Sequence, residues 1–229
     1  MNRTFPGVLA EICANQGVER FVHVSALDAN FDSPSSWARS KAAGEAAVRE
    51  AFPAATILRP ATMFGDEDRF LNRIAKLTQL LPFYPLVDAE TTRQQPVYCD
   101  DVAAAIMEVV QSSKHQGKTL DLAGPKTYTN REIFDYVFTQ IVEPSNAYAV
   151  PRSVGFAMAS AMSLIPNPWM TLDGVRRTTV DICKPEGTPG FEELGITPTP
   201  MEDIADRYLV RFRKTSLFVE DGAVISQEK

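Results

Sequence analysis

Trp37 and Lys41, four positions apart, are the first candidates for a functional site in this chain. Side chains at positions i and i+4 share one face of a helix, and the stretch around this pair is rich in Ala. A Lys ammonium donates hydrogen bonds to ligand hydroxyls. The indole of Trp37 offers only an N–H donor and cannot act as an acid or base near neutral pH. The pair therefore predicts a site that binds a ligand without a proton donor at residue 37.

The segments that must position this pair alternate between short apolar strands and helices. Such alternation with short connections favours an α/β fold with a parallel sheet. We expect Asp100 or Asp101 to cap the fourth helix, and Thr129 with Glu132 to open the fifth as a capping box. The expected strands are residues 20–26, 56–60, 96–98 and 118–123; the expected helices are residues 8–16, 36–52, 70–81, 102–111 and 130–142.

The last third of the chain has a different character. Residues 151–180 are rich in Met and Ala and read as helical, either as the core of a lobe or as an interface surface. Thr199 is expected to cap a final helix over residues 201–214. We therefore predict a nucleotide-binding part over residues 1–150, a small helical lobe over residues 151–214 and a tail over residues 215–229.

The sequence contains no Gly-rich turn of the GxGxxG kind. A doubly wound nucleotide-binding sheet normally opens with a strand and such a turn, which places pyrophosphate on a helix N-terminus. The first strand of this chain instead resembles a middle strand. We expect the opening strands to come from outside this polypeptide, because the protein is longer or because a separate chain supplies them. The alternative is a fold that never had them.

Charge and composition exclude several classes of function. The chain has 229 residues, with 23 basic and 29 acidic side chains and a net charge of −6, which argues against a nucleic-acid binder. Cys13, Cys99 and Cys183 are widely spaced and make no metal-ligand pattern, so we expect no metal site. No run approaches the roughly 20 apolar residues of a membrane span.

An ordered set of segments carries a resemblance to a known family. From about residue 8 to about residue 214, the chain resembles the extended and atypical short-chain dehydrogenase/reductases. Within them it is most similar to the nucleotide-binding accessory subunits of mitochondrial complex I. The segments are Gly17–Ser25, Ser40–Glu45, Thr56–Gly65, Asp66–Asn72, Gln95–Tyr98 with Asp101–Ala103, Gly124–Thr129 and Leu194–Pro200.

The resemblance implies a partial Rossmann-like doubly wound sheet that holds NADPH in a structural role. It also implies other complex I subunits as partners and a place on the matrix side of the inner membrane, peripheral to the bilayer. Active relatives have a Tyr proton donor where this chain has Trp37, so we expect no catalytic residue. The residues expected near the nicotinamide are Ser25, Lys41, Pro60, Ala61 and Met63.

Each of these residues also has a simpler interpretation. Ser25 could bond the local backbone, Lys41 could be solvated, and residues 60–63 could be a strand exit with core packing. We expect Arg59 to form a structural ion pair, His23 to be a sheet residue and His115 to lie in an exposed turn. Two rival functions remain open: an active NAD(P)H-dependent reductase or epimerase, and a soluble regulator that senses the dinucleotide.

Overall fold

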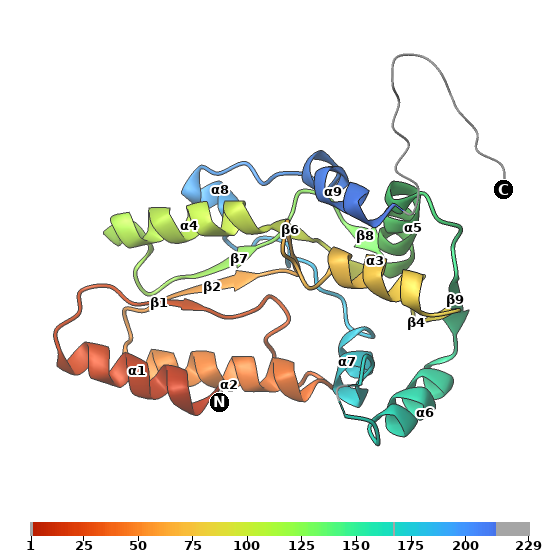
Figure 1. Cartoon of the computed structure of the whole chain (residues 1–229). Helices are drawn as coiled ribbons and strands as arrows, with labels where there is room; N and C mark the ends of the chain where they lie inside the picture. Colours follow the sequence, from red (N-terminus) through yellow and green to blue (C-terminus); the bar gives the residue numbers. More distant parts are fainter. Residues whose placement is uncertain (1, 167, 214–229) are drawn as a thin grey trace, which may run out of the picture.

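The computed structural model describes residues 2–166 and 168–213. Its centre is a parallel sheet in the order β1-β2-β7, covered by α1 and α2 on one face and by α4 on the other (Figure 1). The strands are β1 (Val22–Val24), β2 (Thr56–Pro60), β3 (Met63–Phe64), β4 (Tyr84–Val87), β5 (Arg93–Gln94), β6 (Val97–Tyr98), β7 (Thr119–Leu122), β8 (Tyr128–Thr129) and β9 (Ala147–Val150). The α-helices are α1 (Thr4–Asn15), α2 (Ser36–Ala51), α3 (Leu71–Leu80), α4 (Cys99–Gln111), α5 (Asn130–Ile141), α6 (Arg152–Met162), α7 (Leu172–Arg177), α8 (Phe191–Leu194) and α9 (Glu202–Leu209).

One face of the central sheet carries mainly apolar side chains, as expected for buried parallel strands, whereas the other face also holds Arg59 and Asp121. Leu58 of β2 is fully buried and aligns with Val24 of β1 and with Leu120 of β7. On the far side, β7 meets the C-terminal segment, where Asp121 N donates to Pro189 O at 2.8 Å. In the described part of the chain, β1 pairs with β2 alone, so its other edge is open.

Close helix packing holds α1 against α2. A Cβ added to Gly44 would overlap the backbone oxygen of Asn2, and one added to Gly7 would crowd the side chain of Ala47. Ala10 and Val48 are fully buried in a small apolar cluster between the two helices. The absent side chains of these glycines therefore allow the helices to approach, at the entropic cost that glycine carries in a helix.

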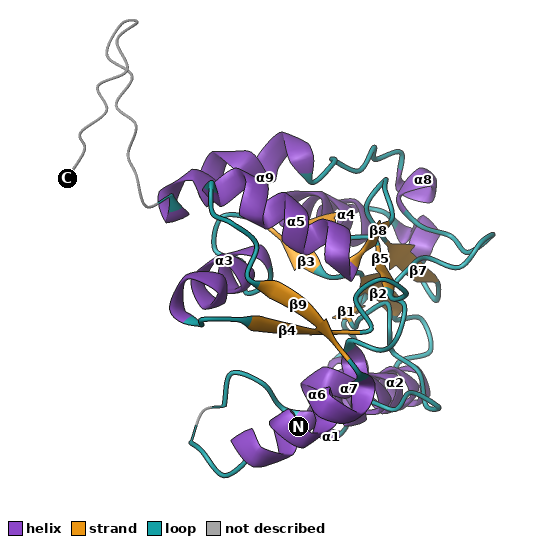
Figure 2. Ribbon diagram, turned by 90° about the vertical axis from the view of Figure 1, so that its right-hand side faces the viewer, coloured by secondary structure: helices purple, strands orange, loops and turns teal. Residues whose placement is uncertain are grey.

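A larger apolar core lies beyond the sheet, among α3, α5 and α9. Figure 2 shows the β4–β9 pair running beside α3 and α5. Leu71, Ile133 and Leu209 are almost completely buried there and come from three different helices. Segments far apart in sequence therefore share one core.

The structure confirms some local expectations and corrects others. Thr129 and Glu132 form the capping box that opens α5. Asp101 does not cap α4; it accepts hydrogen bonds from Thr199 N at 2.6 Å and Thr199 Oγ1 at 3.1 Å. The prediction that Thr199 caps the final helix is therefore also wrong, since α9 begins at Glu202 without a side-chain cap. Lys214 and the predicted tail lie outside the described residues.

The length of the helices bears on membranes. Over residues 2–166 and 168–213, none of the helices combines the length and the apolar character needed to cross a bilayer.

Candidate functional site

Ser25 stands directly after β1, at the edge of the sheet where open α/β folds bind ligands. Its N–H donates to Leu58 O at 2.8 Å, and its buried hydroxyl has no hydrogen-bond partner among the described residues. Two of the predicted neighbours, Pro60 and Ala61, lie at the end of the adjacent strand. Pro60 O accepts from Leu27 N at 2.9 Å, and Ala61 N donates to Leu122 O at 2.8 Å. The sheet thus brings Ser25, Pro60 and Ala61 together. The carbonyl of Pro60 and the N–H of Ala61 are already hydrogen-bonded to the protein backbone.

Lys41 and Trp37 share one face of α2, as their spacing predicts. The Lys41 ammonium lies 5.5 Å from the centre of the Trp37 ring. Burial lowers the pKa of Lys41, and the nearby Arg177 charge lowers it further, while Asp28 and Glu45 act in the opposite direction. Burial also lowers the pKa of His23, with a contribution from Lys41. The Lys41 ammonium is thus electrostatically coupled to His23 of β1 and to Asp28 in the loop that follows it.

A segment far along the chain completes this site. The side chain of Arg177, at the end of α7, is bidentate to the carboxylate of Asp28, with distances of 2.6 and 3.2 Å. The Asp28 side chain is 2% exposed, so its charge needs a partner. The Arg177 guanidinium also lies 4.1 Å from the centre of the Trp37 ring. Trp37 therefore has cationic groups from two different segments near its ring.

The expected role of Arg59 is confirmed. Its Nη2 lies 2.5 Å from Glu45 Oε2, and its Nε lies 3.0 and 3.1 Å from the two carboxylate oxygens. Glu45 raises the pKa of Arg59 through this hydrogen bond, against the effect of burial. The pair joins β2 to α2 and so fixes the helix that carries Lys41.

Two other expectations have different outcomes. His115 is 5% exposed, so the prediction of an exposed turn is wrong; residues 113–115 form a short 3₁₀ turn whose backbone oxygen at His115 accepts from Thr56 Oγ1 at 2.8 Å. Met63 lies on β3, which pairs with β6 outside the three-stranded sheet, and its side chain is 44% exposed. The structure therefore does not group Met63 with the other candidates through any contact that it records. Among the residues described, no cluster of three or more His, Cys, Asp or Glu side chains could hold a metal ion.

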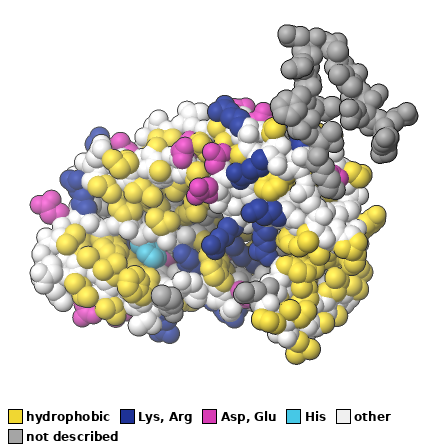
Figure 3. Space-filling view, viewed as in Figure 1, with side chains coloured by type: hydrophobic (Ala, Val, Ile, Leu, Met, Phe, Trp, Pro, Cys, Tyr) yellow, Lys and Arg dark blue, Asp and Glu magenta, His cyan; other side chains and the backbone are white. Residues whose placement is uncertain are grey.

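A cavity of about 460 Å³ lies beside α7, between β4, α3 and α5. Tyr84, Phe134 and Trp169 give it an aromatic lining, and Arg69, Arg73 and Arg177 reach its wall. Figure 3 shows Lys and Arg side chains gathered around a hollow near the middle of this face, beside a hydrophobic surface over α6. The cavity combines an apolar interior with cationic groups, which are the features of a pocket for an anionic organic molecule.

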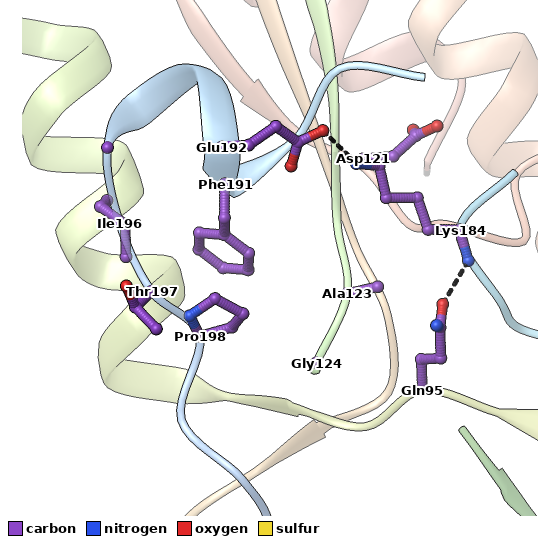
Figure 4. A pocket seen from close by; sticks show the side chains of 11 residues that line it. Gln95, Asp121, Ala123, Gly124, Lys184, Phe191, Glu192, Ile196, Thr197 and Pro198 are labelled. Atoms are coloured by element: carbon purple, nitrogen blue, oxygen red, sulfur yellow. Dashed lines mark hydrogen bonds and ion pairs between the residues drawn. The ribbon is translucent and has the colours of Figure 1, made fainter. Parts of the chain in front are cut away.

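A second cavity, of about 490 Å³, lies at the outer edge of β7. Figure 4 shows Phe191 and Pro198 on one side of β7, and the ion pair of Lys184 with Glu192 across it. Lys184 N donates to Gln95 Oε1 at 2.6 Å, and burial raises the pKa of Asp121 above its ordinary value. Lys184 of this cavity is already paired with Glu192. The contacts of Lys184 therefore attach the C-terminal segment to the sheet.

Sequence reasoning missed Asp28, Asp173 and Arg177. Asp28 and Arg177 are 149 positions apart, and no local pattern connects them. The motif Thr171-Leu-Asp173 does resemble a helix start, and Thr171 does cap α7. Nothing in that motif reveals that Asp173 also binds the start of a different helix.

Comparison with known proteins agrees with this architecture. A model of the RmlD substrate binding domain family matches residues 1–161. NADH dehydrogenase [ubiquinone] 1 alpha subcomplex subunit 9, mitochondrial, from Mus musculus is 39% identical over 199 residues, and the protein of the same name from Arabidopsis thaliana is 35% identical over 208. Each match covers 86% of this chain and 52% of the relative. The chain thus spans about half the length of these relatives.

Solved structures show the same fold. The dTDP-glucose 4,6-dehydratase DesIV from Streptomyces venezuelae, with NAD and TYD bound, aligns with a TM-score of 0.65 at 20% identity, over 92% of this chain and 65% of that one. At this identity the likeness concerns the fold alone, and it confirms the predicted Rossmann-like α/β class. With a family model that matches most of its length, the chain belongs to the RmlD substrate binding domain family and is related to subunits of mitochondrial complex I.

Proposed function

We propose that this chain is part of a non-catalytic accessory subunit of mitochondrial complex I that holds a nicotinamide dinucleotide. The names of its relatives support the assembly. The observation that carries the non-catalytic role is Trp37, which stands four residues before Lys41 with Arg177 4.1 Å from its ring. Hydride transfer to a carbonyl gains about 10²–10⁴ in rate from a positioned proton donor, and an indole cannot supply it.

The dinucleotide that we propose is NADPH, with its nicotinamide end near the carboxyl ends of β1 and β2. Within residues 2–166 and 168–213 the Ser25 hydroxyl has no hydrogen-bond partner, so it can donate to a ligand. The Lys41 ammonium, already partly desolvated, can bind ribose hydroxyls. Pro60 and Ala61 would offer van der Waals contacts, since the sheet already engages Pro60 O and Ala61 N. Met63, which is itself exposed, remains a proposed contact.

We further propose that strands from outside this chain pair with the open edge of β1 and complete the pyrophosphate cradle. Helix α1, which precedes β1 in the chain, carries an apolar face on which Phe5 is 62%, Val8 48% and Ile12 53% exposed. These residues recur at the spacing of one helix face. Apolar surface next to an unpaired strand favours association with further strands and helices.

The proposed location is the matrix side of the mitochondrial inner membrane, with other complex I subunits as partners. The chain would be peripheral to the bilayer and would attach through protein contacts.

Native-gel mass spectrometry of the assembly that contains this chain tests the proposal. We expect the chain to migrate with complex I subunits and the assembly to release NADPH on denaturation. A Lys41→Ala variant should lose most of this nucleotide, whereas Lys118→Ala, on the far edge of the sheet, should retain it. A chain that migrates free of complex I would support the soluble regulator instead.

The rival enzyme is tested by a screen of carbonyl substrates with NADPH. Turnover that disappears in the Lys41→Ala variant would overturn the non-catalytic role. Trp37→Tyr alone should not create turnover, because the Arg177 side chain would still fill the space beside the ring, where a substrate would have to bind.

A further inference from the structure

The carboxylate of Asp173, on α7, binds the start of α2. Asp173 Oδ1 accepts from Ser36 N at 2.6 Å and Ser36 Oγ at 2.9 Å, while Oδ2 accepts from Ser35 Oγ at 2.9 Å and Trp37 N at 3.2 Å. The first N–H groups of a helix have no partner within the helix, and an anion there is favourable. Asp173 thus fixes the first turn of α2, which carries Trp37.

Arg177 makes the second contact, one turn further along α7. Its fork is held by the buried carboxylate of Asp28, and its plane lies over the Trp37 ring. Asp173 therefore binds the backbone N–H of Trp37, and Arg177 contacts its ring. We call these two residues the α7 clasp.

The position of Arg177 also divides two spaces. It lines the 460 Å³ cavity, together with Thr62, Gln94 and Thr178. Ser25, Trp37 and Lys41 are not among the described residues that line this cavity. Arg177 thus lines the cavity and also lies against Trp37, on the helix that carries Lys41.

We propose that the α7 clasp closes the reactive end of the dinucleotide site, with the Arg177 side chain as the wall between that site and the 460 Å³ cavity. An anionic molecule held in the cavity would then meet the guanidinium and would not reach the nicotinamide. This inference deepens the proposed function and rests on it for the position of the nicotinamide. Arg177 is a positioning residue, which acts through Trp37 and through the space that it fills.

The wall can be tested without any dinucleotide, so its failure is distinct from a failure of the proposed function. The sequence contains two tryptophans, Trp37 and Trp169, and a Trp169→Phe background leaves the fluorescence of Trp37 alone. In this background, Arg177→Ala should raise acrylamide quenching of Trp37 about two-fold, because the guanidinium no longer covers the ring. Arg176→Ala is the matched control: this exposed neighbour on α7 should leave quenching unchanged. Equal quenching in the two variants would overturn the proposal.

Further measurements keep the test decisive if Arg177→Ala fails to fold. Arg177→Lys retains the positive charge next to Asp28 and Trp37, and we expect it to restore most of the protection. In the Trp169→Phe chain that keeps Arg177, iodide should quench Trp37 more strongly than caesium does, since Arg177 and Lys41 attract anions to the ring. Equal quenching by iodide and caesium would show that the cations do not stand at the ring, and the wall would be rejected.

Discussion

Two regions of the molecule differ in how far their apolar side chains are buried: the region of α1 and β1, and the region of α3, α5 and α9. In the second region Leu209, Ile133 and Phe64 are almost fully buried by residues of the chain itself. In the first, Phe5 and Ile12 are more than half exposed and β1 has an unpaired edge in the described residues. The incomplete region is also the one where Ser25 and Lys41 lie. The difference agrees with our proposal that strands from outside this chain complete the candidate site, and it sets this region apart from the well-buried core of α3, α5 and α9.

The largest expected effect separates the two cores. Leu209→Ala removes a fully buried side chain from the α9 core, and we expect it to lower the free energy of unfolding by about 2–5 kcal/mol in urea titrations. Leu9 of α1 is 40% exposed, so Leu9→Ala should change the free energy of unfolding by less than about 0.5 kcal/mol in the isolated chain. Equal losses would show that α1 already has a complete core and that the comparison is wrong.

The second prediction concerns how α1 is attached. Gly44→Ala would place a methyl group against the backbone oxygen of Asn2, so we expect a loss of about 1–3 kcal/mol. The same change at an unobstructed helix position stabilises by roughly 0.5–1 kcal/mol. Thermal melting of the variant therefore decides by sign, and a higher melting temperature would mean that α1 does not dock tightly on α2.

The third prediction uses pH. Burial, with a contribution from the Lys41 charge, lowers the pKa of His23 from 6.5. Between the lowered folded value and 6.5, the unfolded chain binds more protons than the folded one, so stability should fall as the pH is lowered through this window. His23→Asn should flatten that part of the stability curve, measured by urea titration at several pH values. Lys41→Met should weaken the slope, and an unchanged slope in both variants would refute the assignment.

The smallest effect is expected at the outer edge of β7. Lys118 and Glu193 pair at 2.7 Å, with side chains 44% and 37% exposed. Exposed pairs of this kind contribute about 0–1 kcal/mol, so Lys118→Ala should barely shift the urea midpoint. A loss comparable to that of Leu209→Ala would show that this edge, too, depends on a few critical contacts.

Much of the fold could be predicted from local patterns. Short apolar runs identified β1, β2 and β7, and the Thr129–Glu132 spacing gave the start of α5 correctly, because each signal acts within a few residues. Asp101 was misread for the same reason. An Asp near a helix start usually caps it, but this side chain binds Thr199, 98 residues away, and tertiary contact overrode the local preference.

The candidate site was predictable in part. Lys41 and Trp37 were placed correctly on one face because helix geometry fixes positions i and i+4. The pair of Arg59 with Glu45 also followed expectation. The roles of Asp28 and Arg177 could not be foreseen, since a buried ion pair between distant segments leaves no periodic signal in the sequence.

The binding of Asp173 to the first turn of α2 has a consequence for the order in which the protein matures. Ser36 and Asp173 are 137 residues apart, so α2 is synthesised well before the carboxylate that binds its first turn. At the usual rate of synthesis of about 5–20 residues per second, α2 waits roughly 7 to 27 seconds for this contact. The first turn of the helix that carries Lys41 therefore gains its last hydrogen-bond partner only after α7 has been translated.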